Sequence, residues 1–339
     1  WELLRTLDQD LDIGPHVPDV LALWAVLCRL DRPLSVDGRS KELQEILRKL
    51  TPMEKAKLYA KGEVPAQLSR DHANQLRGVL AELVTESSTS EIYEGRFGPS
   101  PRELKTVLLA AARSCERSFT GMSILEALRE LCEQKAVYPF LHMESDGDYH
   151  NPVRAIAAVH NWYLDLVEEE LNQAMGLVDH GATIGLLTDY IDHVVHFIRK
   201  EKRLNPLTGR PEEPDETFMG EVEQRLGQTS DKPKRTRESL VHRIAAWRMD
   251  HPDQALNYET LFADFLSRLN DSFYEEKKQQ AQRMKQKLLS LLVDEDAKLS
   301  DDDRAEAQEI LERFEGDYNY PRPCAIEVIA SLLRIRAPS

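Results

Sequence analysis

The stretch FGPSPRELKTVLLAAA, residues 97–112, places a complete set of helix-start signals directly ahead of an apolar run. Ser100 is a good N-cap because its hydroxyl can accept a hydrogen bond from a backbone N–H of the first turn. Pro101 suits the first helical position, where its missing N–H costs nothing, and Glu103 completes a capping box with the serine. The apolar residues that follow recur at helical spacing. The stretch therefore predicts a helix that begins at Pro101.

Arg102 is the residue in this stretch that starting a helix does not explain. A cation in the first turn opposes the helix dipole, at a cost of about 0.3–1 kcal/mol when exposed. If Leu104 and Val107 face inward, Arg102 lies on the opposite face. The comparable helix start at Thr51 has Met53 in the same position. Two interpretations remain: Arg102 is a solvated side chain, or it binds an anion together with the free N–H groups of the helix start.

The rest of the chain shows the same helical chemistry. Apolar side chains recur at intervals of three and four residues, and Gly or Pro punctuates the runs. No run of alternating β-branched residues indicates a sheet. The sequence therefore predicts an all-α protein. Besides the helix at 97–112, helices are predicted at 17–33, 51–62, 66–85, 121–134, 153–178 and 183–204, and residues 258–292 predict either one unusually long helix or two stacked ones.

The chain is long enough for more than one domain. Its 339 residues exceed the usual limit for a single hydrophobic core. The polar stretch MESDGDYHNP, residues 143–152, holds a glycine and a proline and is the best candidate boundary. We therefore predict one helical domain over residues 1–142 and a second over residues 143–339. GQTSDKPKRTRES, residues 227–239, reads as a further polar and basic linker.

The composition is that of an ordinary globular protein, with 41% hydrophobic and 30% charged residues. The net charge of −15 argues against a nucleic-acid-coating surface, and no apolar run approaches the roughly 20 residues that span a bilayer. We therefore expect neither a nucleic-acid nor a membrane partner. Cys28, Cys115, Cys132 and Cys324 are widely scattered, which favours reduced thiols in a cytoplasmic protein. Because the chain begins at Trp1 without an initiator methionine, we expect it to be part of a longer protein.

Motifs of the common phosphate-transfer and hydrolytic enzymes are missing from the sequence. It contains no phosphate-binding loop G-x-x-x-x-G-K-[ST], no H-R-D or D-F-G kinase motif, no G-x-S-x-G and no H-E-x-x-H. The catalytic residues are therefore unknown. His193 and His196, with Asp189 and Asp192 nearby, have a helical spacing that could ligate a metal. A metal site needs ligands from a second element as well, so packing or surface histidines are the favoured interpretation, and we predict no metal site.

Two short runs are strongly basic. RKEKR, residues 199–203, lies at a predicted helix C-terminus, where cations complement the dipole. KPKRTR, residues 232–237, falls in the predicted linker. Each run is either simply solvated, which is the favoured interpretation, or a patch that binds phosphate or an acidic partner.

The stretch YEGRFGPSPRELKTVLLAAA, residues 93–112, resembles the PrkA family of bacterial serine protein kinases. Within it, GPSPRE followed by an amphipathic helix is similar to the sensor-2 segment in the lid domain of AAA+ ATPases. The lid motif is shared widely, whereas the segment between Lys200 and Glu223 is specific to the family. Further similar stretches are IGPHVPDVLALWAVLCRL, GLVDH, YIDHVVHFIRKEKRLNPLTGRPEEPDETFMGEVE and IAAWRMDHP.

This resemblance implies a cytoplasmic protein with an N-terminal AAA+ ATPase core and a C-terminal helical region with serine/threonine kinase activity. The chain would then comprise the lid, residues 1–142, and the PrkA C-terminal domain, residues 143–339. Arg102 matches the sensor-2 arginine, which reaches the γ-phosphate of the nucleotide from the lid. ATP and magnesium would be cofactors of the full-length protein. Neither is expected to bind tightly to this chain alone, because the phosphate-binding loop is not in it.

The resemblance also implies the partners. These are the N-terminal AAA+ core of the same protein and a protein substrate, and the formation of a homo-oligomer remains open. The alternative function is a non-catalytic helical interaction module, which would bind another protein through residues 258–292 and their basic flanks.

Overall fold

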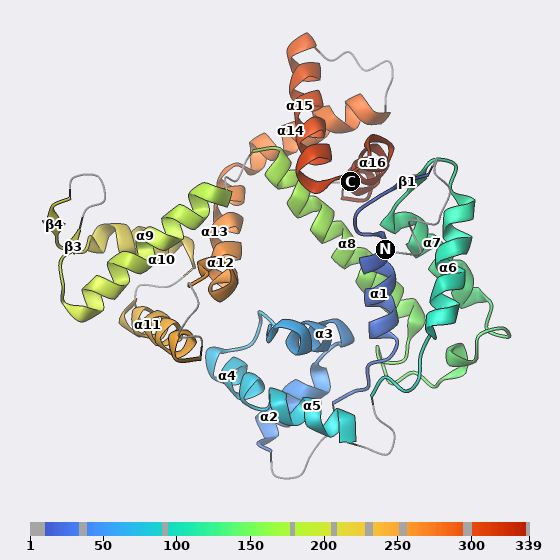
Figure 1. The fold of residues 1–339 in the computed structure, drawn as a ribbon, viewed down its shortest axis with the longest axis horizontal. Helices are drawn as coiled ribbons and strands as arrows, with labels where there is room; N and C mark the ends of the chain where they lie inside the picture. Colours follow the sequence, from blue (N-terminus) through green and yellow to red (C-terminus); the bar gives the residue numbers. More distant parts are fainter. Residues whose placement is uncertain are drawn as a thin grey trace. The chain divides into compact units, whose positions relative to one another are not determined.

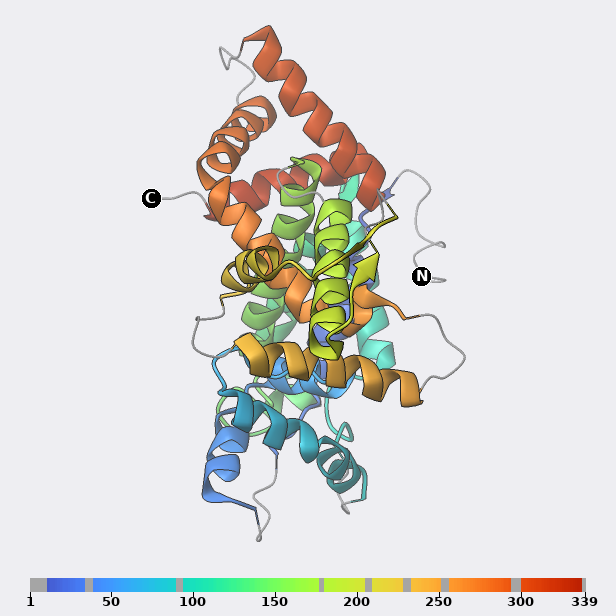
Figure 2. The same ribbon diagram turned by 90° about the vertical axis from the view of Figure 1, so that its left-hand side faces the viewer.

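The computed structural model describes residues 11–33, 39–89, 94–176, 180–204, 209–227, 233–250, 256–293 and 300–336. Nearly all the regular structure in these ranges is helical, as both views of the ribbon show (Figure 1 and Figure 2). The predicted all-α fold class is confirmed. Among the helices in the described ranges, none combines the length and the apolar character needed to cross a membrane.

The strands in these ranges are two residues long. Strand β1 (Asp12–Ile13) pairs in parallel with β2 (Ser118–Phe119), and β3 (Arg203–Leu204) pairs antiparallel with β4 (Pro211–Glu212). Strands this short have no hydrophobic periodicity, so the sequence does not predict them.

The chain forms two compact units. The first comprises Trp1–Glu170 together with Leu311–Ser339, and the second comprises Leu171–Ile310. The boundary predicted at residues 142/143 falls inside the first unit. The assignment of residues 1–142 and 143–339 to two domains stays a prediction.

In the first unit, the core forms around three helices that lie side by side (Figure 1): α1 (Val17–Leu27), α6 (Pro101–Ser114) and α7 (Gly121–Glu133). Trp24 and Leu128 are fully buried in this unit. The remaining helices of the unit are α2 (Lys41–Lys49), α3 (Pro52–Lys61), α4 (Arg70–Gly78), α5 (Leu80–Thr89), the 3-10 helix η2 (Pro139–His142), most of α8 (Pro152–Ala174), the end of α15 (Asp301–Tyr318) and α16 (Arg322–Arg336).

Two helix starts in the first unit confirm the capping predictions. Thr51 and Glu54 form a reciprocal capping box at the start of α3, and Ser100 and Glu103 form one at the start of α6. Helix α3 ends at Gly62, whose positive φ of 67° gives the left-handed C-cap. The single helix predicted over residues 66–85 is wrong, because the chain breaks between α4 and α5 and begins the first of them at Arg70.

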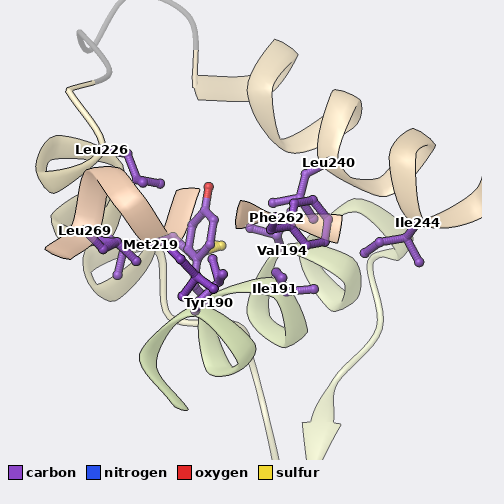
Figure 3. Close-up of a cluster of buried hydrophobic side chains, with 12 residues drawn as sticks. Tyr190, Ile191, Val194, Met219, Leu226, Leu240, Ile244, Phe262 and Leu269 are labelled. Atoms are coloured by element: carbon purple, nitrogen blue, oxygen red, sulfur yellow. The ribbon is translucent and has the colours of Figure 1, made fainter. Parts of the chain in front are cut away.

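In the second unit, helix α9 (His180–Arg199) packs against most of the unit's other helices. Figure 3 shows Tyr190 and Val194 of α9 in one cluster with Met219 and Leu269 from other helices and with Phe262, which lies between two helices. The helices packed against α9 are α10 (Glu216–Arg225), α11 (Pro233–Asp250), α12 (Tyr258–Leu261) and α13 (Ala263–Glu276), and the unit also contains α14 (Lys278–Val293).

Residues 258–292 form neither one long helix nor two. The chain breaks at Phe262 and again at Lys277, which separates α12, α13 and α14. Phe262, at the first break, is fully buried in the core of the unit. The linker predicted over residues 227–239 is wrong in its second half, because helix α11 begins at Pro233.

Candidate functional site

The first candidate site is the start of α6, where the structure places Arg102 on the exposed surface. The Glu103 amide donates to the hydroxyl of Ser100 over 3.3 Å, and the Ser100 amide donates to the Glu103 carboxylate over 2.5 Å. These two bonds hold the first turn in a fixed geometry. No residue in the described part of the chain forms a hydrogen bond or ion pair with the guanidinium of Arg102.

The backbone at this helix start leaves one donor available. Pro101 has no N–H, the Glu103 amide is taken by Ser100, and the Leu104 amide donates to the Ser100 carbonyl over 3.0 Å. The amide of Arg102 is thus the first-turn donor with no acceptor among the described residues. Arg102 therefore offers an amide and a guanidinium at the positive end of a helix, a combination that suits anionic oxygens.

The loop that leads into α6 is held by Arg29, which follows α1. Its Nη1 donates to the Gly95 carbonyl and its Nη2 to the Pro99 carbonyl, each over 2.6 Å. Gly98 has a positive φ of 137°, and a Cβ there would lie 2.5 Å from Cγ of Arg29. Glycine is therefore required at position 98 both by its backbone conformation and by the close approach of Arg29.

The other end of this loop is held by Glu94. Its carboxylate accepts a hydrogen bond from the Asp31 amide over 2.8 Å and forms an ion pair with the ammonium group of Lys55. Lys55 is only 1% exposed and also donates to the Asp31 carbonyl over 2.6 Å. Burial lowers the pKa of Lys55, and the Glu94 carboxylate partly offsets this by favouring the ammonium form. The loop from 94 to 99 is thus anchored at both ends.

Sequence reasoning missed Arg29 and Lys55. For Lys55 a signal exists, because it lies three residues from each of the buried Pro52 and Leu58 and so on the inner face of α3. For Arg29 the sequence gives none, because its acceptors are 66 and 70 residues away and are main-chain carbonyls.

The second candidate site is an open pocket of about 490 Å³ in the second unit. It is formed by α9, by the strands β3 and β4 and by the start of α10. The two strands and the start of α10 lie between Lys200 and Glu223, the stretch whose resemblance to the family is most specific. The lining of the pocket is rich in carboxylates and consists of Asp189, His193, Arg203, Glu212, Glu213, Asp215 and Phe218.

His193 lies between two hydrogen-bond donors in this pocket. The Asp215 amide is 2.9 Å from its Nδ1, and Nη1 of Arg203 is 2.6 Å from its Nε2. A neutral imidazole carries one N–H and one acceptor nitrogen, so it can satisfy only one of these donors. Burial, followed by the charge of Arg203, lowers the pKa of His193, and the ring is therefore neutral at pH 7.

The arrangement around His193 does not bring the predicted histidines together as metal ligands. Both ring nitrogens of His193 face donors, whereas Nδ1 of His196 lies 2.9 Å from the Asp192 carbonyl. Within the described ranges, no cluster of three His, Cys, Asp or Glu residues is arranged to hold a metal ion.

The basic run at 199–203 is not one solvated patch. Arg199 ends α9 and is exposed, whereas Arg203 folds back so that its Nε lies 2.9 Å from the Asp192 carboxylate. In the second basic run, at 232–237, the described basic side chain is that of Arg237. This side chain is buried in α11 and forms an ion pair with Glu223. In both runs an arginine that the sequence placed in solvent is instead bound to a carboxylate of the same unit.

Comparison with known proteins identifies the family. The model of the family described as "PrkA serine protein kinase C-terminal domain" matches residues 53–330, which is most of the chain. "ATP-dependent protease PrkA" of Bacillus subtilis (strain 168) is 26% identical over 239 residues, which are 70% of this chain and 33% of that protein. The chain thus spans about a third of the length of this relative. No solved structure gives a significant match. The chain belongs to the PrkA family.

Proposed function

We propose that this chain is the C-terminal part of an ATP-dependent serine/threonine protein kinase of the PrkA type, and that its first unit responds to bound nucleotide through Arg102. The observation that carries the proposal is the start of α6. There a capping box holds an exposed arginine in the first turn, where a cation opposes the dipole, and no described residue neutralises it. An anionic ligand would supply the missing partner.

ATP supplies a γ-phosphate whose charged oxygens accept hydrogen bonds. Arg102 would bind these oxygens with its guanidinium and its own amide, as charge-assisted bonds. The remaining contacts to phosphate and Mg²⁺ would come from an N-terminal AAA+ core. Occupation of that core would then draw α6 toward the nucleotide, which would couple nucleotide state to the helices that follow.

The names of the relatives support ATP dependence and a protein substrate. The family description names a serine protein kinase, whereas the Bacillus subtilis relative is named an ATP-dependent protease. These are two chemistries, phosphoryl transfer to a hydroxyl and hydrolysis of a peptide bond. We propose the first, and the second is a separate outcome of the experiment below.

The interaction-module alternative has less support. It relies on residues 258–292 as a binding surface, yet Phe262 and Leu269 of this stretch are fully buried in the second unit. Ala281 and Leu288 of α14 are fully buried as well. The apolar faces that would bind a partner are thus already used for packing within the chain.

The test is the substitution Arg102→Ala in the full-length protein, with Arg113→Ala as the matched control. Arg113 is exposed in the last turn of the same helix, so its removal changes the same charge far from the helix start. A hydrogen bond to a charged group contributes about 1.5–3 kcal/mol. The turnover of ATP, or the affinity for it, should therefore fall by about 10- to 100-fold in Arg102→Ala and should change little in Arg113→Ala.

The products distinguish the two chemistries. Radiolabelled γ-phosphate that appears on serine or threonine supports the kinase, whereas peptide fragments that depend on ATP contradict it in favour of the protease. Unchanged ATP kinetics in Arg102→Ala would show that Arg102 does not respond to nucleotide.

A further inference from the structure

We propose that Arg29 is the positioning residue for Arg102: it fixes the chain at Gly95 and Pro99, and so sets where α6 presents its arginine. The inference deepens the proposed function and rests on it, because it concerns how Arg102 reaches a phosphate. It is independent of which reaction the whole protein performs.

Arg29 is itself held firmly. It comes two residues after the end of α1, and Trp24 and Leu27 of that helix are buried in the core of the first unit. An arginine fork offers donors in a fixed plane, which suits two carbonyls at once. The carbonyls of Gly95 and Pro99 accept hydrogen bonds from Nη1 and Nη2 of this guanidinium, respectively.

The link from Pro99 to Arg102 is stiff. Pro99 and Pro101 each have φ fixed near −65° by their rings. Ser100 between them is locked by its capping box with Glu103. A displacement of the Pro99 carbonyl is therefore carried to Arg102 rather than absorbed in between.

The loop between Glu94 and Pro99 is shaped around the Arg29 side chain. Gly98 leaves open the space that a Cβ would take from Cγ of Arg29. Glu94 holds the start of the loop through Lys55 and the Asp31 amide, so Arg29 determines the position of the end that is nearer to α6.

The experiment uses the full-length protein with Arg29→Gln, Arg29→Lys and Gly98→Ala. Arg29→Gln removes the fork, Arg29→Lys keeps one cationic donor, and Gly98→Ala displaces the arginine without removing it. Arg32→Gln is the matched control. Arg32 also donates to a main-chain carbonyl over 2.6 Å, that of Arg48, and it makes no hydrogen bond to the loop at 95–99.

The first readout is amide hydrogen exchange without nucleotide, in peptides that cover residues 95–108. The loss of two bonds from a charged donor should raise exchange there by at least about tenfold in Arg29→Gln, by less in Arg29→Lys, and not at all in Arg32→Gln. Gly98→Ala should resemble Arg29→Gln. Unchanged exchange in both Arg29→Gln and Gly98→Ala would overturn the anchoring role.

The second readout is ATP kinetics in Arg29→Gln, Arg102→Ala and the double variant. A misplacement of about 1 Å can cost up to about 100-fold in rate. We expect Arg29→Gln to raise KM for ATP or lower kcat in the same pattern as Arg102→Ala, and the double variant to lose nothing further. Fully additive losses would overturn the proposal, because they would show that Arg29 acts independently of Arg102.

The two failures are distinguishable. If Arg102→Ala impairs ATP kinetics and Arg29→Gln does not, the positioning role is wrong and the proposed function stands. If Arg102→Ala leaves ATP kinetics unchanged, the proposed function is wrong, and the exchange data then show only that Arg29 anchors the loop.

Discussion

Arg237 and Glu223 form a buried, bidentate ion pair in the second unit. Nε of the arginine lies 2.6 Å from Oε1 of the glutamate, and Nη2 lies 2.9 Å from Oε2. The hydroxyl of Tyr190 also donates to this carboxylate, over 3.0 Å. The pair joins α11 to α10 and α9, so it ties three helices of the same unit together.

Arg237→Met should destabilise the protein by about 3–5 kcal/mol, because it leaves the Glu223 carboxylate buried without its cation. Arg243→Met is the control. Arg243 lies on the same helix and pairs with Asp264 over 3.0 Å, but both side chains of this pair are more than 40% exposed. Exposed pairs contribute about 0–1 kcal/mol. Urea unfolding of the two variants measures the difference, and equal losses would contradict the burial argument.

His16 and Glu170 give the first unit a pH dependence. Nε2 of His16 lies 2.7 Å from Oε1 of Glu170, whose other oxygen accepts a hydrogen bond from Tyr320 over 3.1 Å. Burial lowers the pKa of His16, but the hydrogen bond and charge of Glu170, with a smaller effect from Asp19, outweigh it and leave the pKa raised.

Because the folded pKa is raised, the histidine stabilises the fold fully below its ordinary value of 6.5, and this contribution is lost as the pH rises through the folded pKa. The free energy of unfolding of the wild type minus that of His16→Gln should therefore be largest below pH 6.5 and decrease as the pH rises above it. Unfolding in denaturant at a series of pH values tests this. A difference that grows with pH would contradict the assignment of the pair.

Gly121→Ala should destabilise the first unit by about 1–3 kcal/mol through overpacking. A Cβ at Gly121 would lie 2.7 Å from the Tyr163 ring and 2.9 Å from Val20. Gly220→Ala is the opposite case, because Gly220 lies inside α10, where the added carbon would meet no described atom within 4 Å outside its chain neighbours and the backbone of its own helix. It should stabilise by about 0.5–1 kcal/mol, because alanine is the better helix former. Thermal unfolding should shift in opposite directions for the two variants.

The local part of the fold could be predicted from the sequence. Ser100, Pro101 and Glu103 determine a helix start with atoms that lie within three residues of one another, and the structure has the same capping box. The break at Phe262 could not be predicted in this way. An aromatic residue within a helical pattern does not reveal that its side chain is required in a core built by other helices.

At the candidate sites, too, local features could be predicted from the sequence, whereas contacts made by packing could not. The exposure of Arg102 follows from the helical face on which it lies, because local geometry determines that face. The half-buried position of Arg203 and the burial of Arg237 do not follow from sequence, because their carboxylate partners are 11 and 14 residues away and are brought close only by the packing of the unit. A run of basic residues was therefore a poor guide to which arginines reach solvent.

Arg102→Ala should make the protein more stable while it impairs the response to ATP. The exposed cation opposes the helix dipole in the first turn of α6, so its removal should stabilise by about 0.3–1 kcal/mol. Arg113→Ala should do the reverse, because a cation in the last turn complements the dipole. Thermal unfolding of both variants, measured alongside ATP turnover, separates function from folding. If Arg102 served stability, the Arg102→Ala variant would lose both stability and ATP turnover. If Arg102 binds nucleotide, the variant should lose ATP turnover while its stability rises.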